Sequence, residues 1–374
     1  MRREWANWFW HIRNRIQDIR SLEKWIHLSR EEREAIHYAS TGLGLRMAIT
    51  PHFASIMDKE NPQCPIRRQA IPSLEELEEG ENDLNDPCGE EEDTVVPGLV
   101  HRYPDRVLFL MTDACAMYCR HCTRKRMVGE KEETLSAEKQ EKIYQYIEAN
   151  SQIRDVLISG GDPLMLSDGK LEEVLCRLRK IPHVEIIRIG SRIPVTLPQR
   201  ITKNLAKLLK RFHPLYMSIH FNHPVEITEA TIQACERLAD AGIPMGSQTV
   251  LLKGINDSPE VMKTLMHKLL MIRVKPYYIY QCDLARGTEH FRTPVSMGIR
   301  IIESLRGHTS GYAVPAFVID APGGGGKVPL NPETIISRTK KEFIIRNWKN
   351  EIFIYPQNRI ADDKLVKIHI KERR

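Results

Sequence analysis

The chain has 374 residues, of which 41% are hydrophobic and 28% are charged, and it is long enough for a barrel-sized core with appendages. The formal net charge of +6 is modest and the basic residues are dispersed, so the composition argues against nucleic acid as a partner. The sequence shows no secretory signal, no apolar stretch long enough to span a bilayer and no disulfide-like framework. We therefore expect no membrane partner and a reduced, cytoplasmic setting.

Residues 1–95 are expected to form a helical region followed by an acidic linker. From Trp5 to about residue 48, tryptophans and other apolar residues recur at helical spacing between charged residues. This pattern indicates amphipathic helices whose tryptophan stripe packs in a core. Ser29 and Glu32 have the spacing of a capping box, which predicts the start of a second helix.

An acidic run occupies residues 75–93, inside a stretch that five prolines interrupt between residues 50 and 95. Prolines at such density predict irregular structure. Blocks of like charge are usually hydrated, so we interpret the acidic run as a solvated linker rather than a metal site.

From about residue 96, strand-like apolar runs alternate with amphipathic helical runs. The expected strands are residues 107–112, 155–159, 184–190, 215–221, 245–252 and 276–281. The expected helices lie near residues 136–150, 169–181, 198–212, 226–241, 258–273 and 295–307. Six such units over residues 96–330 predict an α/β fold with a partial (β/α)6 barrel, whose chemistry is expected at the C-terminal ends of the strands.

Three cysteines follow the first of these strands at intervals of four and three residues: Cys115, Cys119 and Cys122. A [4Fe–4S] cluster usually takes four thiolates, so three leave one iron open to another ligand. The spacing resembles the radical S-adenosylmethionine (SAM) superfamily, in which that iron holds the amino and carboxylate groups of SAM. The alternatives are unrelated thiols or half of a zinc site, although zinc normally takes a second ligand pair at similar spacing.

The second strand ends in Gly160, Gly161 and Asp162. Glycines let the backbone approach a ligand closely. In the radical SAM superfamily a turn of this kind lines the amino group of SAM, and its position one β/α unit after the cysteines strengthens the resemblance.

Polar residues also follow later strands. His220 and His223 have a spacing that metal ligands can have, but no Asp or Cys completes a set, so we interpret them as polar groups at the barrel mouth. Gln248, on the fifth strand, is expected within reach of a ligand in the barrel.

A last apolar strand ends at Asp320, and four glycines then lead to Lys327. The loop lacks the Ser/Thr and the helix of a phosphate-binding Walker motif. A single lysine on a flexible loop suits a Schiff base with pyridoxal 5′-phosphate (PLP), and a mobile surface lysine is the alternative. Residues 331–374 are expected to form a hairpin, with strands at residues 343–348 and 351–355, followed by a tail.

Together the cysteine motif and the lysine loop resemble the lysine 2,3-aminomutase family, over residues 5–348. The stretches that carry the resemblance are residues 101–106, 115–126, 278–283, 290–295, 306–312 and 320–327. The resemblance implies a partial barrel, a [4Fe–4S] cluster, SAM and PLP. It also implies an isomerase that interconverts L-α-lysine and L-β-lysine. In that reaction a 5′-deoxyadenosyl radical from SAM starts a 1,2-migration of the amino group on a PLP external aldimine.

The resemblance also implies roles for individual residues. Lys327 matches the PLP lysine, Arg124 the residue that binds the substrate carboxylate, and Asp283 and Asp320 the pair that holds the distal ammonium of lysine. Two carboxylates suit an ammonium, and an arginine suits a carboxylate. Further cofactor contacts are expected from Arg102 and Arg106, at the phosphate of PLP, and from His121, Gly160, Gly161, Asp162 and Gln248. The alternative for Arg102 and Arg106 is surface salt bridging.

Two related substrates define the alternative function: glutamate, or a lysine on a protein. The glutamate branch replaces the two aspartates, and both are present here, so lysine is favoured. A non-catalytic iron–sulfur protein is the third hypothesis. We further expect a reducing electron donor such as flavodoxin or ferredoxin, and a homo-oligomer that is a dimer or higher. No cysteine follows Cys282, so the family's C-terminal zinc site is not carried over.

Overall fold

The computed structural model describes residues 2–42, 44–129, 131–339 and 341–357. The chain divides into two compact units, Met1–Leu330 and Asn331–Arg374. The tail that the sequence predicts after the hairpin lies outside the described residues from residue 358 onward.

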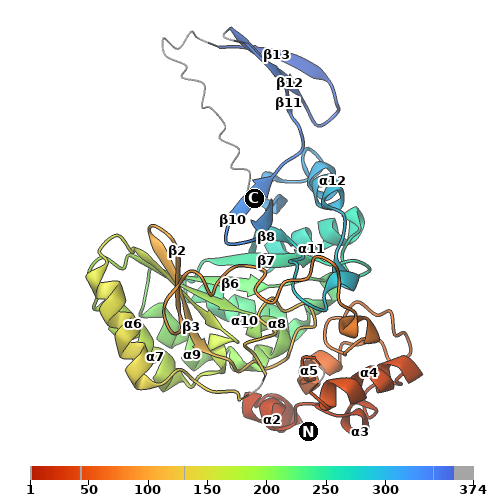
Figure 1. Ribbon diagram of the computed structural model, residues 1–374, viewed down its shortest axis with the longest axis vertical. Helices are drawn as coiled ribbons and strands as arrows, with labels where there is room; N and C mark the ends of the chain where they lie inside the picture. Colours follow the sequence, from red (N-terminus) through yellow and green to blue (C-terminus); the bar gives the residue numbers. More distant parts are fainter. Residues whose placement is uncertain (1, 43, 130, 340, 358–374) are drawn as a thin grey trace. The chain divides into compact units, whose positions relative to one another are not determined.

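The chain begins with short helices (Figure 1). They are α1 (Arg2–Trp5), α2 (Trp8–Arg13), α3 (Ile19–Leu22), α4 (Arg30–Ser40) and α5 (Pro51–Ala54). The predicted capping box is confirmed, because the Ser29 hydroxyl accepts from the Glu32 amide at 3.1 Å and the Glu32 carboxylate accepts from the Ser29 amide at 2.8 Å. The helical region is divided because Asn7 and Asp18 cap new helices at α2 and α3.

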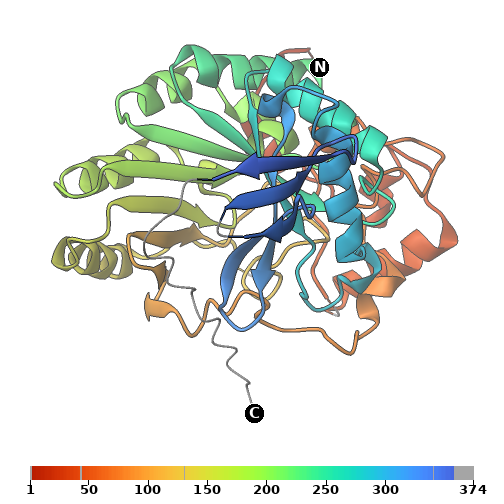
Figure 2. The same ribbon diagram turned by 90° about the horizontal axis from the view of Figure 1, so that it is seen from above.

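The first unit contains a ten-stranded sheet whose strands lie side by side in sequence order (Figure 2). The strands are β1 (Thr94–Val96), β2 (Leu99–Tyr103), β3 (Arg106–Thr112), β4 (Asp155–Gly160), β5 (Ile186–Ser191), β6 (Leu215–His220), β7 (Met245–Leu251), β8 (Lys275–Gln281), β9 (Ala316–Ala321) and β10 (Gly326–Leu330). Strands β3 to β9 pair parallel with one another, whereas β1 with β2, β2 with β3, and β9 with β10 pair antiparallel. The predicted partial barrel is confirmed, and β9 extends its parallel part by one strand.

Amphipathic helices connect the parallel strands. They are α6 (Ala137–Ala149), α7 (Asp168–Arg179), α8 (Ile193–Thr196), α9 (Lys203–Lys210), α10 (Glu229–Asp240), α11 (Pro259–Met271) and α12 (Val295–Leu305). Short 3₁₀ turns are η1 (Leu74–Leu77), η2 (Pro163–Met165), η3 (Pro198–Arg200), η4 (Pro224–Glu226), η5 (Glu289–Phe291) and η6 (Gly311–Ala313). In α9, for example, Leu205, Leu208 and Leu209 are buried in the core, as the helical period requires. Within the described residues, every helix is too short or too polar to cross a bilayer.

The second unit contains a three-stranded antiparallel sheet of β11 (Ile335–Arg338), β12 (Glu342–Arg346) and β13 (Ile352–Pro356). Strands β12 and β13 form the predicted hairpin. Asn350 lies in its turn with a φ of 64°, a left-handed conformation that asparagine tolerates better than most residues.

The acidic run of residues 75–93, which we call the acidic strap, packs on the barrel and is not a solvated linker, so that prediction is wrong. Its carboxylates pair with cations from other segments: Glu76 with Arg120 and Lys125, Asp83 with Arg292, Asp86 with Arg126, Glu90 with Arg124, and Asp93 with Arg102. Burial opposes ionisation of Glu76, but Arg120 and Lys125 outweigh it and lower the pKa of Glu76 to about 2. A backbone bridge from Leu84 to Ala285 holds the strap beside the loop after β8.

Candidate functional site

The three cysteines lie in the loop that follows β3. Cys115 and Cys122 pack against a small apolar cluster of Leu45, Ala48, Tyr118 and Val128, and all three thiols are free. Burial raises the pKa of the Cys115 and Cys122 thiols, and the charges of neighbouring cysteines raise them further. Three thiols gathered in one loop are a donor set that fits a [4Fe–4S] cluster with one iron left open.

Arg192, at the C-terminal end of β5, contacts this loop. The sequence analysis did not predict a role for this residue. Its Nη1 donates to the Cys119 sulfur at 2.7 Å, and its Nη2 donates to Glu226 at 2.9 Å. The position of Arg192 just after a parallel strand was the available signal, but only the structure identifies Cys119 as its partner.

Asp162 holds Arg192 in place. Its carboxylate accepts from the backbone amides of Leu164, Arg192 and Ile193 and from the Ser191 hydroxyl. Burial raises the pKa of Asp162 to about 6, although these hydrogen bonds favour the ionised form. Three of these donors belong to Ser191, Arg192 and Ile193 at the end of β5, whereas Asp162 follows β4. The Asp162 side chain therefore ties the end of β4 to the end of β5.

Gly160 and Gly161 lie against the segment that leads into the cysteine loop. A Cβ atom at Gly160 would collide with the backbone of Thr112, and one at Gly161 with the backbone of Ala114. Gly160 also has a φ of 134°. The two glycines are therefore required for β4 to end close beside Cys115.

His121 lies between two of the cysteines and is buried. Its Nε2 contacts Asn222 at 3.1 Å, whereas its Nδ1 is buried without a hydrogen-bond partner in the described part of the chain. Burial and the nearby Arg192 keep the pKa of His121 well below its usual value, so the ring is neutral. Because buried polar atoms are rarely unpaired, Nδ1 is available to a bound group.

Gln248 lies on β7, and its amide donates to the Tyr280 hydroxyl at 3.1 Å. Burial lowers the pKa of His220 to about 3, and His223 caps the turn after β6. Among the described residues, neither histidine belongs to a group of side chains arranged to hold a metal.

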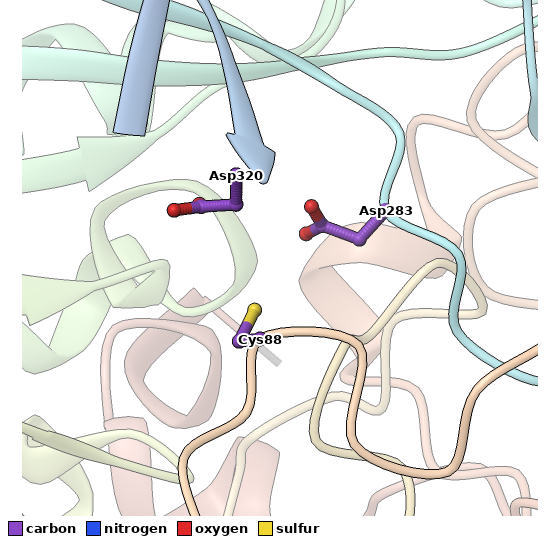
Figure 3. Close-up of side chains that lie close together, drawn as sticks. All are labelled: Cys88, Asp283 and Asp320. Carbon is purple, nitrogen blue, oxygen red and sulfur yellow. The ribbon is translucent and has the colours of Figure 1, made fainter. Parts of the chain in front are cut away.

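Two carboxylates and a thiol come together where β8 and β9 end (Figure 3). Asp283 follows β8 and Asp320 lies near the end of β9, and the thiol of Cys88 approaches both from the acidic strap. One ligand atom from each of these three residues lies within 4.8 Å of the other two. Burial and the charge of Asp320 raise the pKa of Asp283 to about 7, although Lys327 and Arg124 partly oppose this shift. Cys88 was not predicted, because a single cysteine among acidic residues carries no distinctive pattern.

Lys327 lies opposite Asp320 in the antiparallel register of β9 and β10. Its Nζ is 3.1 Å from both carboxylate oxygens of Asp320 and 5.4 Å from the centre of the Tyr280 ring. Gly323 and Gly324 have φ values of 69° and 78°, which allow the tight turn between the strands. The loop therefore presents the lysine amine beside Asp320.

Arg102 lies beside the glycine loop, since its Nη2 is 3.9 Å from the position of a Cβ atom at Gly324, whereas Arg106 pairs with Asp105. Arg102 donates to Asp93 at 2.6 Å, and Arg106 stacks over the Tyr103 ring at 3.9 Å. The Tyr103 hydroxyl in turn accepts from the Lys327 amide at 2.9 Å. A lysine on this glycine loop and an arginine beside the loop fit PLP, which needs a Schiff-base lysine and cationic phosphate ligands.

Arg124 pairs with Glu90 of the acidic strap. Its Nε lies 2.9 Å from Oε2 of Glu90 and its Nη2 lies 2.6 Å from Oε1. Arg124 is also close enough to Asp283 to lower the pKa of that carboxyl. The structure thus brings a guanidinium, two carboxylates and the lysine amine into one neighbourhood.

Two family models match the sequence: the radical SAM superfamily over residues 109–265 and lysine-2,3-aminomutase over residues 302–369. The chain is 56% identical to the L-lysine 2,3-aminomutase of Fusobacterium nucleatum over 357 residues, which cover 95% of this chain and 84% of the relative. It is 55% identical to the L-lysine 2,3-aminomutase of Clostridium subterminale, covering 95% and 85%. It is 44% identical to the glutamate 2,3-aminomutase of Clostridioides difficile, covering 97% and 86%.

Proposed function

The chain belongs to the lysine 2,3-aminomutase family of the radical SAM superfamily and is an L-lysine 2,3-aminomutase, and on this premise we propose which of its residues bind substrate and cofactors. The enzyme is an isomerase that moves an amino group within lysine. Its superfamily implies an iron–sulfur cluster and SAM.

The substrate is held at both ends in this proposal. Arg124 binds the α-carboxylate, since a guanidinium presents parallel N–H groups to the two oxygens. Asp283 and Asp320 bind the distal ammonium. The observation that carries the proposal is the convergence of these two carboxylates with the raised pKa of Asp283, because a bound cation relieves their repulsion. Glutamate would add a third carboxylate to the same pocket.

PLP is proposed to bind through Lys327, with Arg102 and Arg106 at its phosphate. When bound, PLP supplies the conjugated system on which the amino group migrates. Without PLP, Asp320 pairs with the amine of Lys327. Once PLP takes up that amine, the carboxylate of Asp320 would be left open to the distal ammonium of the substrate.

Cys115, Cys119 and Cys122 are proposed to hold the cluster. When bound, the cluster and SAM supply the radical that removes a hydrogen atom from the substrate. Arg192 donates to the sulfur of Cys119 and so fixes its orientation. His121 offers an unpaired Nδ1 to SAM. Gly160 and Gly161 hold the end of β4 against the cysteine loop, Asp162 anchors Arg192, and Gln248 lines the barrel beside Tyr280.

We also propose a reducing electron donor such as flavodoxin or ferredoxin, a homo-oligomeric assembly and a cytoplasmic location. The family supports the electron donor and the assembly, and an oxygen-labile cluster needs a reducing compartment.

An anaerobic assay tests the substrate. The protein is reconstituted with iron, sulfide and PLP, supplied with SAM and a reductant, and given lysine or glutamate as sole substrate. We expect β-lysine from lysine and little product from glutamate. Glutamate as the preferred substrate would contradict the proposed pocket, whatever the state of the cluster.

A further inference from the structure

Glu90 of the acidic strap is buried against Arg124, the residue proposed to bind the substrate carboxylate. Only 7% of Glu90 is exposed. Burial disfavours its charge, but the Arg124 guanidinium beside it outweighs burial and lowers the pKa of Glu90. The same ion pair raises the pKa of Arg124. A charged pair is therefore maintained inside the site where a negatively charged group of the substrate must also bind.

The two oxygens of Glu90 occupy one edge of the guanidinium. They accept from Nε at 2.9 Å and from Nη2 at 2.6 Å. A guanidinium has five N–H donors and a second edge, made by Nη1 and Nη2, that can also grip a carboxylate in a bidentate way. In the described part of the chain, the side chain of Arg124 has no other hydrogen-bond partner. The second edge is thus available for the substrate.

Glu90 is itself held by its neighbours in the strap. Arg102 donates to the carboxylate of Asp93 at 2.6 Å and to the carbonyl of Gly89 at 2.9 Å. Gly89 lies so close to Gly324 that a Cβ atom added to Gly89 would be 2.8 Å from the backbone nitrogen of Gly324. Contacts of Gly89 and Asp93 therefore hold the segment that carries Glu90 beside Arg102 and the glycine loop.

The strap also reaches the other end of the pocket, where Cys88 approaches Asp283 and Asp320. Two residues apart in sequence, Cys88 and Glu90 thus contact the groups proposed for the ammonium and for the carboxylate of the substrate. A single segment thus lies beside both groups.

We propose that Glu90 is a positioning residue for substrate recognition: it holds Arg124 by one edge so that the other edge faces the α-carboxylate of lysine. This inference rests on the proposed role of Arg124. It predicts that Glu90 controls the affinity for substrates that carry a carboxylate and leaves the chemical step unchanged.

The test is Glu90→Gln, with Glu91→Gln as the matched control. Glu91 is the next residue, pairs with Arg126 and is exposed, so the same chemical change is made outside the pocket. We expect Glu90→Gln to raise KM for lysine at least about tenfold, the factor that about 1.4 kcal/mol produces. We expect kcat to stay within about twofold, because positioning of this kind acts on binding. The control should match the wild-type protein.

A second ligand separates positioning from a general loss of structure. Pentane-1,5-diamine carries both ammonium groups but no carboxylate, so its inhibition constant should be the same in Glu90→Gln and wild type. Calorimetric binding of lysine should weaken in parallel with the rise in KM. Equal weakening for the diamine and for lysine would overturn the proposal.

Arg124→Gln and the double variant distinguish the two possible failures. If Arg124→Gln leaves KM unchanged, the carboxylate role proposed for Arg124 is wrong. If Arg124→Gln raises KM but Glu90→Gln leaves it unchanged or lowers it, the site is right and the positioning role is wrong. If Glu90 acts through Arg124, the double variant should be no worse than Arg124→Gln alone. If Glu90→Gln fails to fold or to bind the cluster, Glu90→Asp replaces it, because it keeps the charge on a shorter side chain. We expect Glu90→Asp to have wild-type stability and a KM for lysine between those of wild type and Arg124→Gln. A wild-type KM in Glu90→Asp would also overturn the proposal.

Discussion

If Asp283 binds the distal ammonium as proposed, the recognition of lysine should depend on pH near neutrality. Burial and the adjacent Asp320 raise the pKa of Asp283 to about 7 in the substrate-free protein. The distal amine of lysine has a pKa of about 10.4 and stays charged throughout this range. Only the ionised carboxylate makes a charge-assisted pair with that ammonium, so protonated Asp283 has to lose its proton before lysine binds well.

The size of the effect follows from the pKa. About one tenth of Asp283 is ionised one pH unit below its pKa, and about nine tenths is ionised one pH unit above it. The ratio kcat/KM for lysine reports on the free enzyme. It should therefore rise roughly tenfold between about pH 6 and pH 8. Other groups, including the α-amino group of the substrate, titrate in the same assay. Dividing the wild-type profile by that of Asp283→Asn removes their contribution, because they are common to both proteins.

The expected result is a ratio that rises with pH and levels off above pH 8. A ratio that is constant over this interval would show that Asp283 is already ionised in the free protein, and would refute the reasoning about burial and repulsion.

Stability gives an independent measurement of the same group. The folded pKa of Asp283 lies above its unfolded value, so its contribution to stability is fully present below about pH 4 and is lost as pH rises through about 7. Three pKa units correspond to roughly 4 kcal/mol. The substrate-free wild type should therefore lose stability relative to Asp283→Asn as pH rises, in a thermal or denaturant unfolding experiment, and addition of lysine should reverse the loss.

Three further predictions concern the other groups. Replacing Cys115, Cys119 or Cys122 by Ala should abolish the visible absorbance of the cluster and the cleavage of SAM while far-ultraviolet circular dichroism stays the same; a triple variant that still cleaves SAM would exclude the assignment. Borohydride treatment of the PLP-loaded protein should add a pyridoxyl group to the peptide that contains Lys327, and Lys327→Ala should lose PLP and turnover; label on a different lysine would be the contrary result. Asp320→Asn should lower kcat/KM for lysine at least about tenfold, since a charge-assisted hydrogen bond contributes about 1.5–3 kcal/mol, with PLP and iron content unchanged; undiminished lysine turnover would contradict the ammonium site.

The barrel is predictable from the sequence because its strands are local apolar runs. Each predicted strand from residue 107 to residue 281 agrees with β3 to β8 within two residues at either end. The placement of β9 beside β8 was harder to predict from the sequence, since residues 312–320 are followed by the glycine loop and not by another helix. Sequence periodicity indicates that a strand is buried, but not which strand it pairs with.

The acidic strap shows where sequence reasoning fails. A run of like charges is hydrated unless cations from elsewhere meet it, and here those cations are supplied by residues 102–126 and by Arg292. The contacts of Glu90 with Arg124 and of Cys88 with Asp283 join residues far apart in the chain. Composition and spacing contain no information on such pairs, so the residues that complete the pocket were found only in the structure.

The strap also has a consequence for the order in which the protein is made. Residues 75–93 contain eleven acidic residues and no basic one, and their partner cations all follow them in the chain, so they emerge from the ribosome first. Until the partner cations have also emerged, the negative charges repel one another and favour an extended, hydrated segment. The same residues are therefore expected to be hydrated in the nascent chain, whereas in the folded protein they lie beside the proposed lysine site. Because Asp320 lies on β9, a translation product that stops before this strand lacks part of the proposed lysine site.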